Sequence, residues 1–240
     1  MQRISQMKNV KKSSYLTRTL FLLIIIAISG IIYTSFKDFT LSPAEQFELA
    51  QKAEKENSPF KAERYYLMAS TSSDKNVSKL AAYYLGNLYR LGGNGFPING
   101  PKAEMFLEQA ALQNLPQAQY ELALMYDVGD KILENREKAA RWMNLAAQNG
   151  YIDAVYSLGV WVERGYLGEP DMQKVLALYE QAAQHGHIYA ITSLIALYSG
   201  GSKKVEPNPE KATYWMNKIV EMNKQGSVQT TQKQPKSETK

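Results

Sequence analysis

The chain has 240 residues, of which 45% are hydrophobic and 21% are charged, a composition that suits one folded domain or an elongated array. It contains no cysteine, which excludes disulfide bonds, thiolate metal sites and a cysteine nucleophile. The formal net charge is +5, but residues 38–222 carry 18 Lys and Arg against 22 Asp and Glu. The excess positive charge therefore lies at the two ends, and the mildly acidic middle disfavours nucleic acid as a partner.

The first 36 residues have the pattern of a membrane-targeting segment. Residues 1–19 carry five positive charges and no acid, and residues 20–36 carry no charge at all. A run of this length is near the lower limit for a membrane-spanning helix, which is about 17 residues. Because positive flanks stay in the cytoplasm, we expect a cytoplasmic segment 1–19 and a transmembrane signal anchor at 20–36, with the remainder exported. In a bacterium this is a single-pass inner-membrane protein whose repeat domain is periplasmic.

Two other interpretations of this segment remain open. A cleaved signal peptide is one, because Ala27-Ile28-Ser29 offers small residues at offsets that suit a signal peptidase. A buried core helix is the other, although such a helix would normally show a polar face. The signal anchor and the signal peptide both predict that the body of the protein is exported.

Residues 43–78 are a shortened copy of the repeat that follows them. Leu49-Ala50 and Lys61-Ala62 echo its two halves, and Ser58-Pro59 resembles its helix start. The leucine-to-lysine spacing is 12, whereas it is 16 or 17 in the later units. We therefore predict a degenerate helical hairpin that caps the N-terminal end of an array.

Residues 79–222 contain the strongest signal in the sequence, a motif that recurs about every 36 residues. Its copies define four predicted units, at 79–117, 118–153, 154–189 and 190–222. Each contains a leucine, an alanine four residues before it and a glycine seven residues after it: Leu85, Leu122, Leu158 and Leu194; Ala81, Ala118, Ala154 and Ala190; Gly92, Gly129, Gly165 and Gly201. The leucines are separated by 37, 36 and 36 residues, which indicates one repeated structural unit.

The spacing within a unit predicts two helices. In the first half, apolar or small residues fall at offsets 0, 4, 7, 8 and 11 from the alanine, which is one stripe of an α-helix. A lysine marks the second half, and three residues before it stands a good helix N-cap: Asn99 before Lys102, Asn135 before Lys138, Asp171 before Lys174 and Asn208 before Lys211. Each unit is therefore a predicted hairpin, which must stack on its neighbours to bury its apolar face.

These residues carry a family resemblance. The pattern A-x-x-x-L-G-x-x-Y-x-x-G, followed by K-A-x-x-W-x-x-x-A-A-x-x-G, resembles the Sel-one-like repeat (SLR), a relative of the tetratricopeptide repeat, over residues 44–222. The second and fourth units replace the glycine after the leucine with Ala123 and Ile195, and the third has Val162 in the tyrosine slot. The resemblance implies an all-α superhelical solenoid that serves as a protein-binding scaffold, in bacteria often in the cell envelope.

The sequence offers little that could support catalysis. His185 and His187 flank a glycine where a helix should end, and we interpret them as a solvated helix terminus, because no acidic pair at ligand spacing joins them. The run at residues 92–95, Gly-Gly-Asn-Gly, lacks the Gly-Lys-Ser/Thr ending of a phosphate loop. We predict no catalytic residue, metal site, cofactor or small-molecule substrate, and thus a protein that is not an enzyme.

A partner protein is expected to bind the inner wall that the first helices of the units form in this family. Offsets 2, 6 and 9 from the repeat alanine lie on that wall. The candidate residues are Tyr83, Asn87, Arg90, Tyr120, Leu124, Asp127, Tyr156, Val160, Glu163 and Thr192. The three tyrosines recur one repeat apart and could form an aromatic ladder suited to an interface. Alternatively, they pack between repeats as structural residues.

Residues 223–240 are rich in Gln, Ser, Thr and Lys, without apolar periodicity, and are predicted to be disordered. The leading functional hypothesis is a membrane-tethered scaffold or adaptor that recruits or regulates a partner in the cell envelope. The alternative is an immunity protein that inhibits a toxin enzyme delivered to the periplasm, such as a secreted phospholipase, because some proteins with these repeats and similar N-termini are of that kind. Neither hypothesis names the partner.

Overall fold

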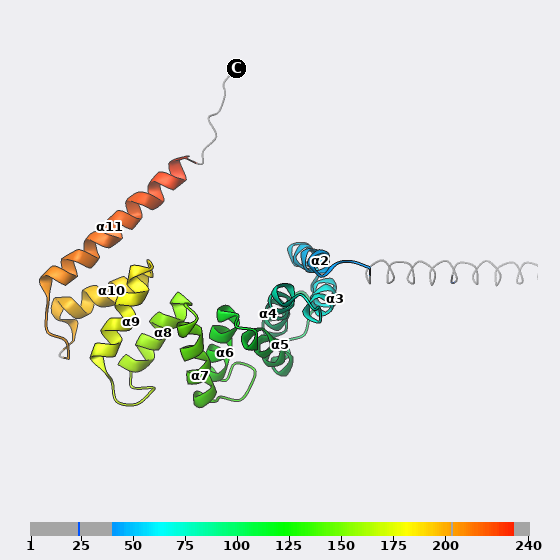
Figure 1. Cartoon of the computed structure of the whole chain (residues 1–240), viewed down its shortest axis with the longest axis horizontal. Coiled ribbons are helices and arrows are strands. Elements are labelled where there is room, and N and C mark those ends of the chain that lie inside the picture. The colour runs from blue at the N-terminus through cyan, green and yellow to red at the C-terminus, as the bar shows by residue number, and fades with distance from the viewer. Residues whose placement is uncertain (1–23, 25–39, 203, 233–240) are drawn as a thin grey trace, which may run out of the picture.

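A computed structural model of the chain describes Ile24, residues 40–202 and residues 204–232. From Pro43 onward these residues form helices that pair into hairpins (Figure 1). The bounds are α2 (Pro43–Lys55), α3 (Pro59–Ser70), α4 (Lys75–Leu91), α5 (Gly100–Leu112), α6 (Pro116–Val128), α7 (Arg136–Gln148), α8 (Ile152–Glu163), α9 (Met172–Gln184), α10 (Ile188–Ala196), the π-helical turn η1 (Leu197–Gly201) and α11 (Pro209–Gln232). The predicted solenoid of stacked helical hairpins is confirmed.

The predicted membrane segment falls almost wholly outside the described residues. Of residues 20–36, the structure describes Ile24 alone, which is helical. Within the described part of the chain, no helix combines the length and the apolar character needed to cross a membrane.

The second helices begin where the sequence places their N-caps. The side-chain oxygens of Asn99 and Asn135 accept from the backbone N–H groups three residues on, at 3.0 and 2.9 Å. Asp171 accepts from two backbone N–H groups at 3.0 and 3.1 Å, and Asn208 from one at 2.9 Å. Ser58 differs, because its hydroxyl donates to the Glu56 carbonyl and makes no cap hydrogen bond. The α3 start therefore depends on Pro59 at the first helical position.

The repeat alanines and glycines allow close helix contact. Ala81, Ala118, Ala154 and Ala190 have no exposed surface. A Cβ atom added at Gly86 of α4 would lie 2.7 Å from the Leu107 Cγ atom of α5, and one at Gly159 of α8 would lie 2.6 Å from a Tyr179 ring carbon of α9. Real side-chain carbons do not approach so closely, so these two positions require glycine for the hairpin helices to pack as they do.

Three tyrosines join neighbouring hairpins through a contact that we call the Glu–Tyr–Lys bridge. At Tyr126 of α6, the hydroxyl donates to the Glu104 carboxylate of α5 and accepts from the Lys138 ammonium of α7 at 3.0 Å. The ammonium also lies 4.6 Å from the tyrosine ring centroid. The other bridges are Glu63–Tyr89–Lys102 and Glu180–Tyr198–Lys211. The repeat lysine is thus part of the contact between units.

The junction between α7 and α8 lacks this bridge. Val162 occupies the tyrosine position, and the α7 positions that correspond to the bridge glutamates are Ala140 and Asn144. In the third unit, the Tyr179 hydroxyl of α9 donates instead to Glu163 of α8 at 2.6 Å. The capping hairpin has the same internal bond, from Tyr66 of α3 to Glu54 of α2 at 2.6 Å.

The C-terminal boundary differs from the predicted one. The helix α11 runs to Gln232, past residue 222. Residues 223–232, the first part of the segment expected to be disordered, are therefore helical. Residues 233–240 lie outside the described residues. The segment from Asn223 to Gln232 contains no proline, and a helix that is already formed extends at low cost, one hydrogen bond per added residue.

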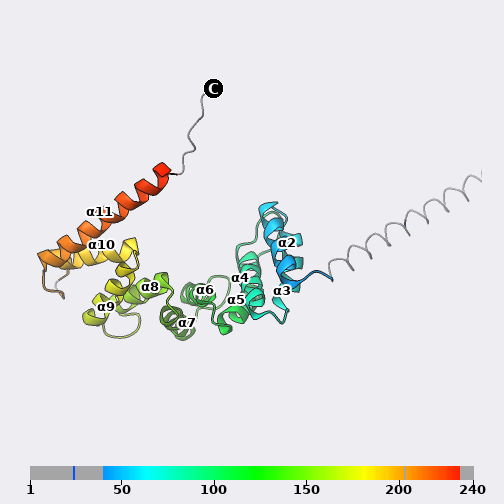
Figure 2. The same ribbon diagram turned by 45° about the horizontal axis from the view of Figure 1, so that its top comes forward.

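The hairpins form an arc (Figures 1 and 2). Both views place α4, α6, α8 and α10 toward the inner side of the arc and α5, α7 and α9 toward its outer side. The helix α11 extends away from the C-terminal end. The first helix of each unit therefore lines the inner wall, where the candidate residues were expected.

Candidate protein-binding surface

The N-terminal part of the inner wall is held by an ion-pair network centred on Arg90 of α4. Its guanidinium lies 3.1 Å from the Glu121 carboxylate of α6 and 3.7 Å from that of Asp130. The Asn87 side-chain oxygen accepts from the same guanidinium at 3.2 and 3.3 Å. Burial raises the pKa of the neighbouring Tyr83, and the Glu121 charge adds to the increase. The structure thus brings Tyr83, Asn87 and Arg90 together.

The predicted aromatic ladder is interleaved with other rings. Among the ring contacts of the described residues, none joins Tyr83 to Tyr120 or Tyr120 to Tyr156. Tyr120 of α6 instead contacts Tyr151 at the start of α8, with ring centroids 5.1 Å apart. Tyr156 of α8 stacks on His187 at the start of α10, with centroids 4.5 Å apart. Tyr120 and Tyr156 therefore each span the step to the next inner helix, whereas the Tyr83 ring contacts Tyr84 of its own helix.

His187 is a structural part of this wall and not a solvated helix terminus. Its side chain is 12% exposed, and its Nε2 atom lies 3.4 Å from the Asp153 carboxylate of α8. Its Nδ1 atom accepts from the Ala190 backbone N–H at 3.2 Å, so the ring caps α10. The sequence interpretation failed here because the stacking ring and the carboxylate both come from α8, the preceding inner helix. His185 is exposed at the end of α9, as expected.

The remaining candidates divide by burial. Leu124 and Val160 are half-buried against the core, and the Glu163 carboxylate accepts from the Tyr179 hydroxyl, so these three residues hold the solenoid together. Thr192 is exposed on α10. Its neighbour Tyr189 was not a candidate, although it is 70% exposed and its ring lies 6.3 Å from that of Tyr156.

The structure adds Tyr151, Asp153 and Glu121 to the wall. Burial raises the pKa of Tyr151 to about 12, and the Asp153 carboxylate adds to the increase. Tyr151 and His187 both stand three residues before a repeat alanine, and the corresponding residue before Ala118 is Leu115. The sequence signal for these two wall residues is the aromatic ring that recurs at this position. Because the position precedes the first helix of the unit, the offsets used for the inner face of that helix do not include it.

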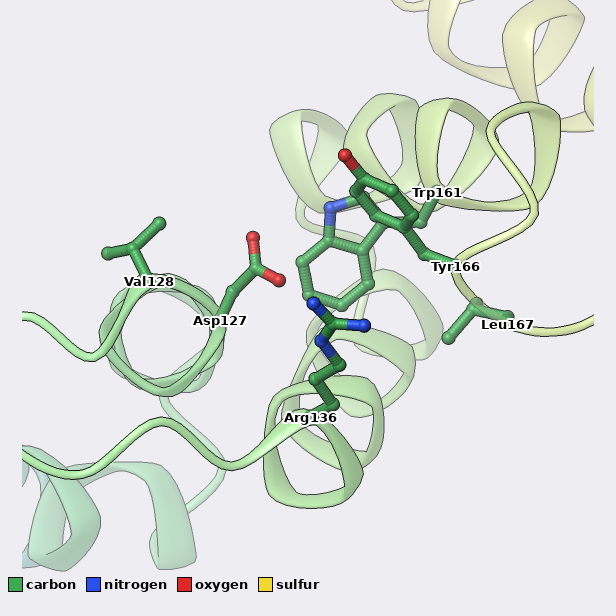
Figure 3. Close-up of a pocket in the computed structure, with 6 residues that line it drawn as sticks. All are labelled: Asp127, Val128, Arg136, Trp161, Tyr166 and Leu167. Carbon is green, nitrogen blue, oxygen red and sulfur yellow. The ribbon is translucent and has the colours of Figure 1, made fainter.

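Asp127 lies apart from this network, in a cleft between the second and third units. Figure 3 shows its carboxylate directed toward the Arg136 guanidinium and the rings of Trp161 and Tyr166. Asp127 and Arg136 come from α6 and α7, whereas Trp161 is on α8 and Tyr166 is in the loop that follows it. The candidate surface thus consists of a wall and a separate cleft near its edge.

Comparison with known proteins identifies the repeat. The Sel1 repeat model matches residues 79–115, 116–151, 152–187 and 194–224, which together make up more than half of the chain. The chain belongs to the Sel1 repeat family. Proteins of this family generally act as scaffolds that bind other proteins, and the match gives no indication of enzyme activity.

Two solved structures share the fold of this Sel1 repeat protein. One is a Sel1 repeat protein from Oxalobacter formigenes, with a TM-score of 0.63 and 23% identity over 75% of this chain and 71% of that one. The other is a protective antigen present in uropathogenic Escherichia coli strains, with a TM-score of 0.64 and 23% identity over 75% of this chain and 38% of that one. Saccharomyces cerevisiae protein SHC1 is 28% identical over 131 residues, which is 52% of this chain and 25% of the yeast protein. The chain therefore spans only part of the yeast protein and of the antigen.

Proposed function

We propose that this Sel1 repeat protein is a membrane-anchored adaptor that binds a partner protein along its inner wall. The observation that carries the proposal is the continuous row of rings and charges from Arg90 through Tyr120 and Tyr156 to Tyr189. Aromatic rings with one polar end are typical of protein interfaces. Because neighbouring side chains already fix several of these rings, little conformational entropy is lost when a partner binds.

The anchor follows from the sequence. Five positive charges before residue 20 and the uncharged run at 20–36 support a topology with the N-terminus in a bacterial cytoplasm and the repeats in the periplasm. A tether confines the repeat domain to the membrane surface and raises its effective concentration toward a partner at the same surface.

The wall is tested by crosslinking in intact cells followed by mass spectrometry of the captured proteins. Tyr189→Ala combined with Thr192→Arg alters the wall at two exposed residues, which avoids the packed rings of Tyr120 and Tyr156. Met105→Arg on the outer helix α5, where Met105 is 54% exposed, is the matched control. We expect the wall variant to lose the main crosslinked protein and the control to retain it. Loss in the control alone, or equal yields in all three proteins, would contradict the proposal.

Topology is measured separately. A reporter fused to the C-terminus is expected to be active only outside the cytoplasm, and the intact mass of the mature chain is expected to include residues 1–36. A cytoplasmic reporter would refute the anchored topology, and a chain shortened near Ser29 would indicate cleavage.

The identity of the crosslinked protein distinguishes an adaptor from an inhibitor. An envelope assembly protein supports an adaptor, and a toxin enzyme that kills only cells lacking this protein would identify an inhibitor.

A further inference from the structure

The cleft between the second and third units has the composition of a site for a positively charged side chain. Its volume is about 250 Å3. The residues that line it are Asp127, Val128, Arg136, Trp161, Tyr166 and Leu167. Binding sites for drug-sized molecules usually enclose roughly 300–1,000 Å3, so a cleft of this volume suits one side chain better than a whole small molecule.

Asp127 supplies a carboxylate that is not engaged in a hydrogen bond or an ion pair within the described part of the chain. Among the residues that the structure describes, none forms a hydrogen bond or an ion pair with it. Burial raises the pKa of Asp127, and the charge of Arg136 only partly offsets that effect. The Arg136 guanidinium faces Asp127 (Figure 3) but forms no ion pair with it, and its Nε atom lies 3.0 Å from the Glu134 carboxylate on a side chain that is 80% exposed. Together, Asp127, Glu134 and Arg136 leave one unbalanced negative charge at the cleft.

The aromatic side of the cleft is specific to this junction. Trp161 is 6% exposed and stands where the other units have Leu88, Met125 and Leu197. Tyr166, in the following loop, is 53% exposed and faces the same space (Figure 3). The faces of indole and phenol rings attract cations, and Trp is the strongest of the aromatic side chains in this respect.

We infer that this cleft receives a lysine or arginine side chain of the partner protein, with the charged end between Asp127 and the two rings. The aliphatic stem of such a side chain can cover Val128 and Leu167, which are 71% and 39% exposed. The inference rests on the proposed function, because the occupant belongs to a protein that the inner wall holds. It adds the chemistry of one contact, which the wall residues do not specify.

The test uses the isotope-labelled full chain in detergent micelles and the indole N–H signals of its three tryptophans. Trp142→Phe and Trp161→Phe assign these signals. The probes are blocked tripeptides whose central residue is arginine, lysine, citrulline, norleucine or glutamate. Citrulline has nearly the shape of arginine without its charge, and norleucine has the lysine stem without the ammonium. We expect the arginine and lysine peptides to shift the Trp161 signal saturably, and the other three to leave it in place at the same concentrations.

Variants connect the signal to the proposed contacts. We expect Asp127→Asn to weaken arginine-peptide binding about fivefold. This loss of affinity lies between the usual contribution of an exposed ion pair and that of a hydrogen bond to a charged group in a cleft. Tyr166→Ala should weaken it about threefold by removing one cation–π contact. Glu169→Gln, an exposed carboxylate on the same loop, is the control and should leave affinity unchanged.

Several results would overturn the inference. Equal binding of the arginine and citrulline peptides would mean that charge is not recognised, and a preference for glutamate would mean that Arg136 determines the specificity. No Trp161 shift with any peptide, or unchanged affinity in Asp127→Asn, would also refute it. These outcomes are independent of the adaptor proposal, because the Tyr189→Ala and Thr192→Arg variant tests the wall without altering the cleft.

Discussion

One repeat position has three different roles in three successive units. Nine residues after the repeat alanine stand Arg90, Asp127 and Glu163. Arg90 pairs with Glu121 of the next inner helix, and Glu163 accepts from Tyr179 within its own hairpin. Asp127 alone faces a cleft without a hydrogen-bond partner among the described residues. The sequence offset predicts that all three lie on the same wall and does not distinguish these roles, because the roles depend on residues of other helices.

The isolated carboxylate predicts a stability effect with a definite sign. Because burial raises the pKa of Asp127, the folded chain binds more protons there than the unfolded chain does between the two pKa values. The stability contributed by this group therefore falls as pH rises through that range, and the ionised Asp127 is unfavourable at neutral pH. Asp127→Asn should raise the melting temperature at pH 7, as measured by circular dichroism.

The difference between wild type and Asp127→Asn should shrink at acid pH. At roughly pH 3 and below, about one unit under the ordinary pKa of an Asp carboxyl, most folded and unfolded wild-type chains carry a neutral side chain at residue 127. Glu169→Gln serves again as the control, because Glu169 is exposed. A lower melting temperature for Asp127→Asn at pH 7 would show that Arg136 stabilises the ionised carboxylate more than burial penalises it.

At the scale of the helices, two kinds of tyrosine contact hold the hairpins. The Glu–Tyr–Lys bridge joins an inner helix to the outer helices on both sides of it, whereas the Tyr66–Glu54 and Tyr179–Glu163 bonds close a hairpin on itself. The bridge glutamate stands two residues after the repeat lysine in α3 and α5 but six residues after it in α9. These two positions are about one helical turn apart, so both can reach the same tyrosine.

The bridge at Tyr126 should contribute measurably to stability. Tyr126→Phe keeps the ring but removes the hydroxyl between Glu104 and Lys138, and we expect a loss of about 1 kcal/mol. For a chain of this size, that corresponds to a melting temperature lower by about 2–4 °C. Tyr214→Phe is the control, because Tyr214 is 58% exposed on α11. Equal melting temperatures for wild type and Tyr126→Phe would indicate that the bridge is compensated by water in the variant.

The sequence predicts the helices better than the contacts between them. The hairpins, the N-caps at Asn99 and Asn135 and the close helix crossings follow from local spacing, because periodicity and capping involve residues a few positions apart. The bridges were not predicted, although Lys138 and Tyr126 are both repeat positions, because the bridge glutamate does not keep a fixed place in the repeat. The cleft beside Trp161 was missed for a similar reason, since its two sides come from different units.

For the whole molecule, the α7–α8 junction is the one step between described hairpins that lacks a Glu–Tyr–Lys bridge. In stacked repeats, stability is approximately a sum of unit and interface contributions. Because this junction lacks the bridge, we expect its interface to contribute less than the others and to divide the array into two cooperative parts, with the cleft at the boundary between them. We therefore expect this junction to open before the others.

Hydrogen exchange under mild denaturant should show that division. Amides of α4–α7 are expected to share one opening free energy, and those of α8–α10 another.

A second test restores the missing bridge. Ala140→Glu combined with Val162→Tyr would supply the glutamate and the tyrosine that form a bridge with Lys174. The coupling free energy of the two changes should be favourable by about 1 kcal/mol, whatever each change costs alone. Uniform exchange along the wild-type array, or purely additive effects of the two changes, would contradict this view.

Because Asp127 and Trp161 belong to adjacent hairpins, the cleft exists only while those two hairpins are neighbours. Tandem duplication of α4–α5 would lengthen the arc and leave the cleft intact. Insertion of one more hairpin between Gln148 and Ile152 would separate the carboxylate from the indole, with every original side chain still present. For the proposed recognition of a basic side chain, the order of the repeats therefore matters as much as the residues within them.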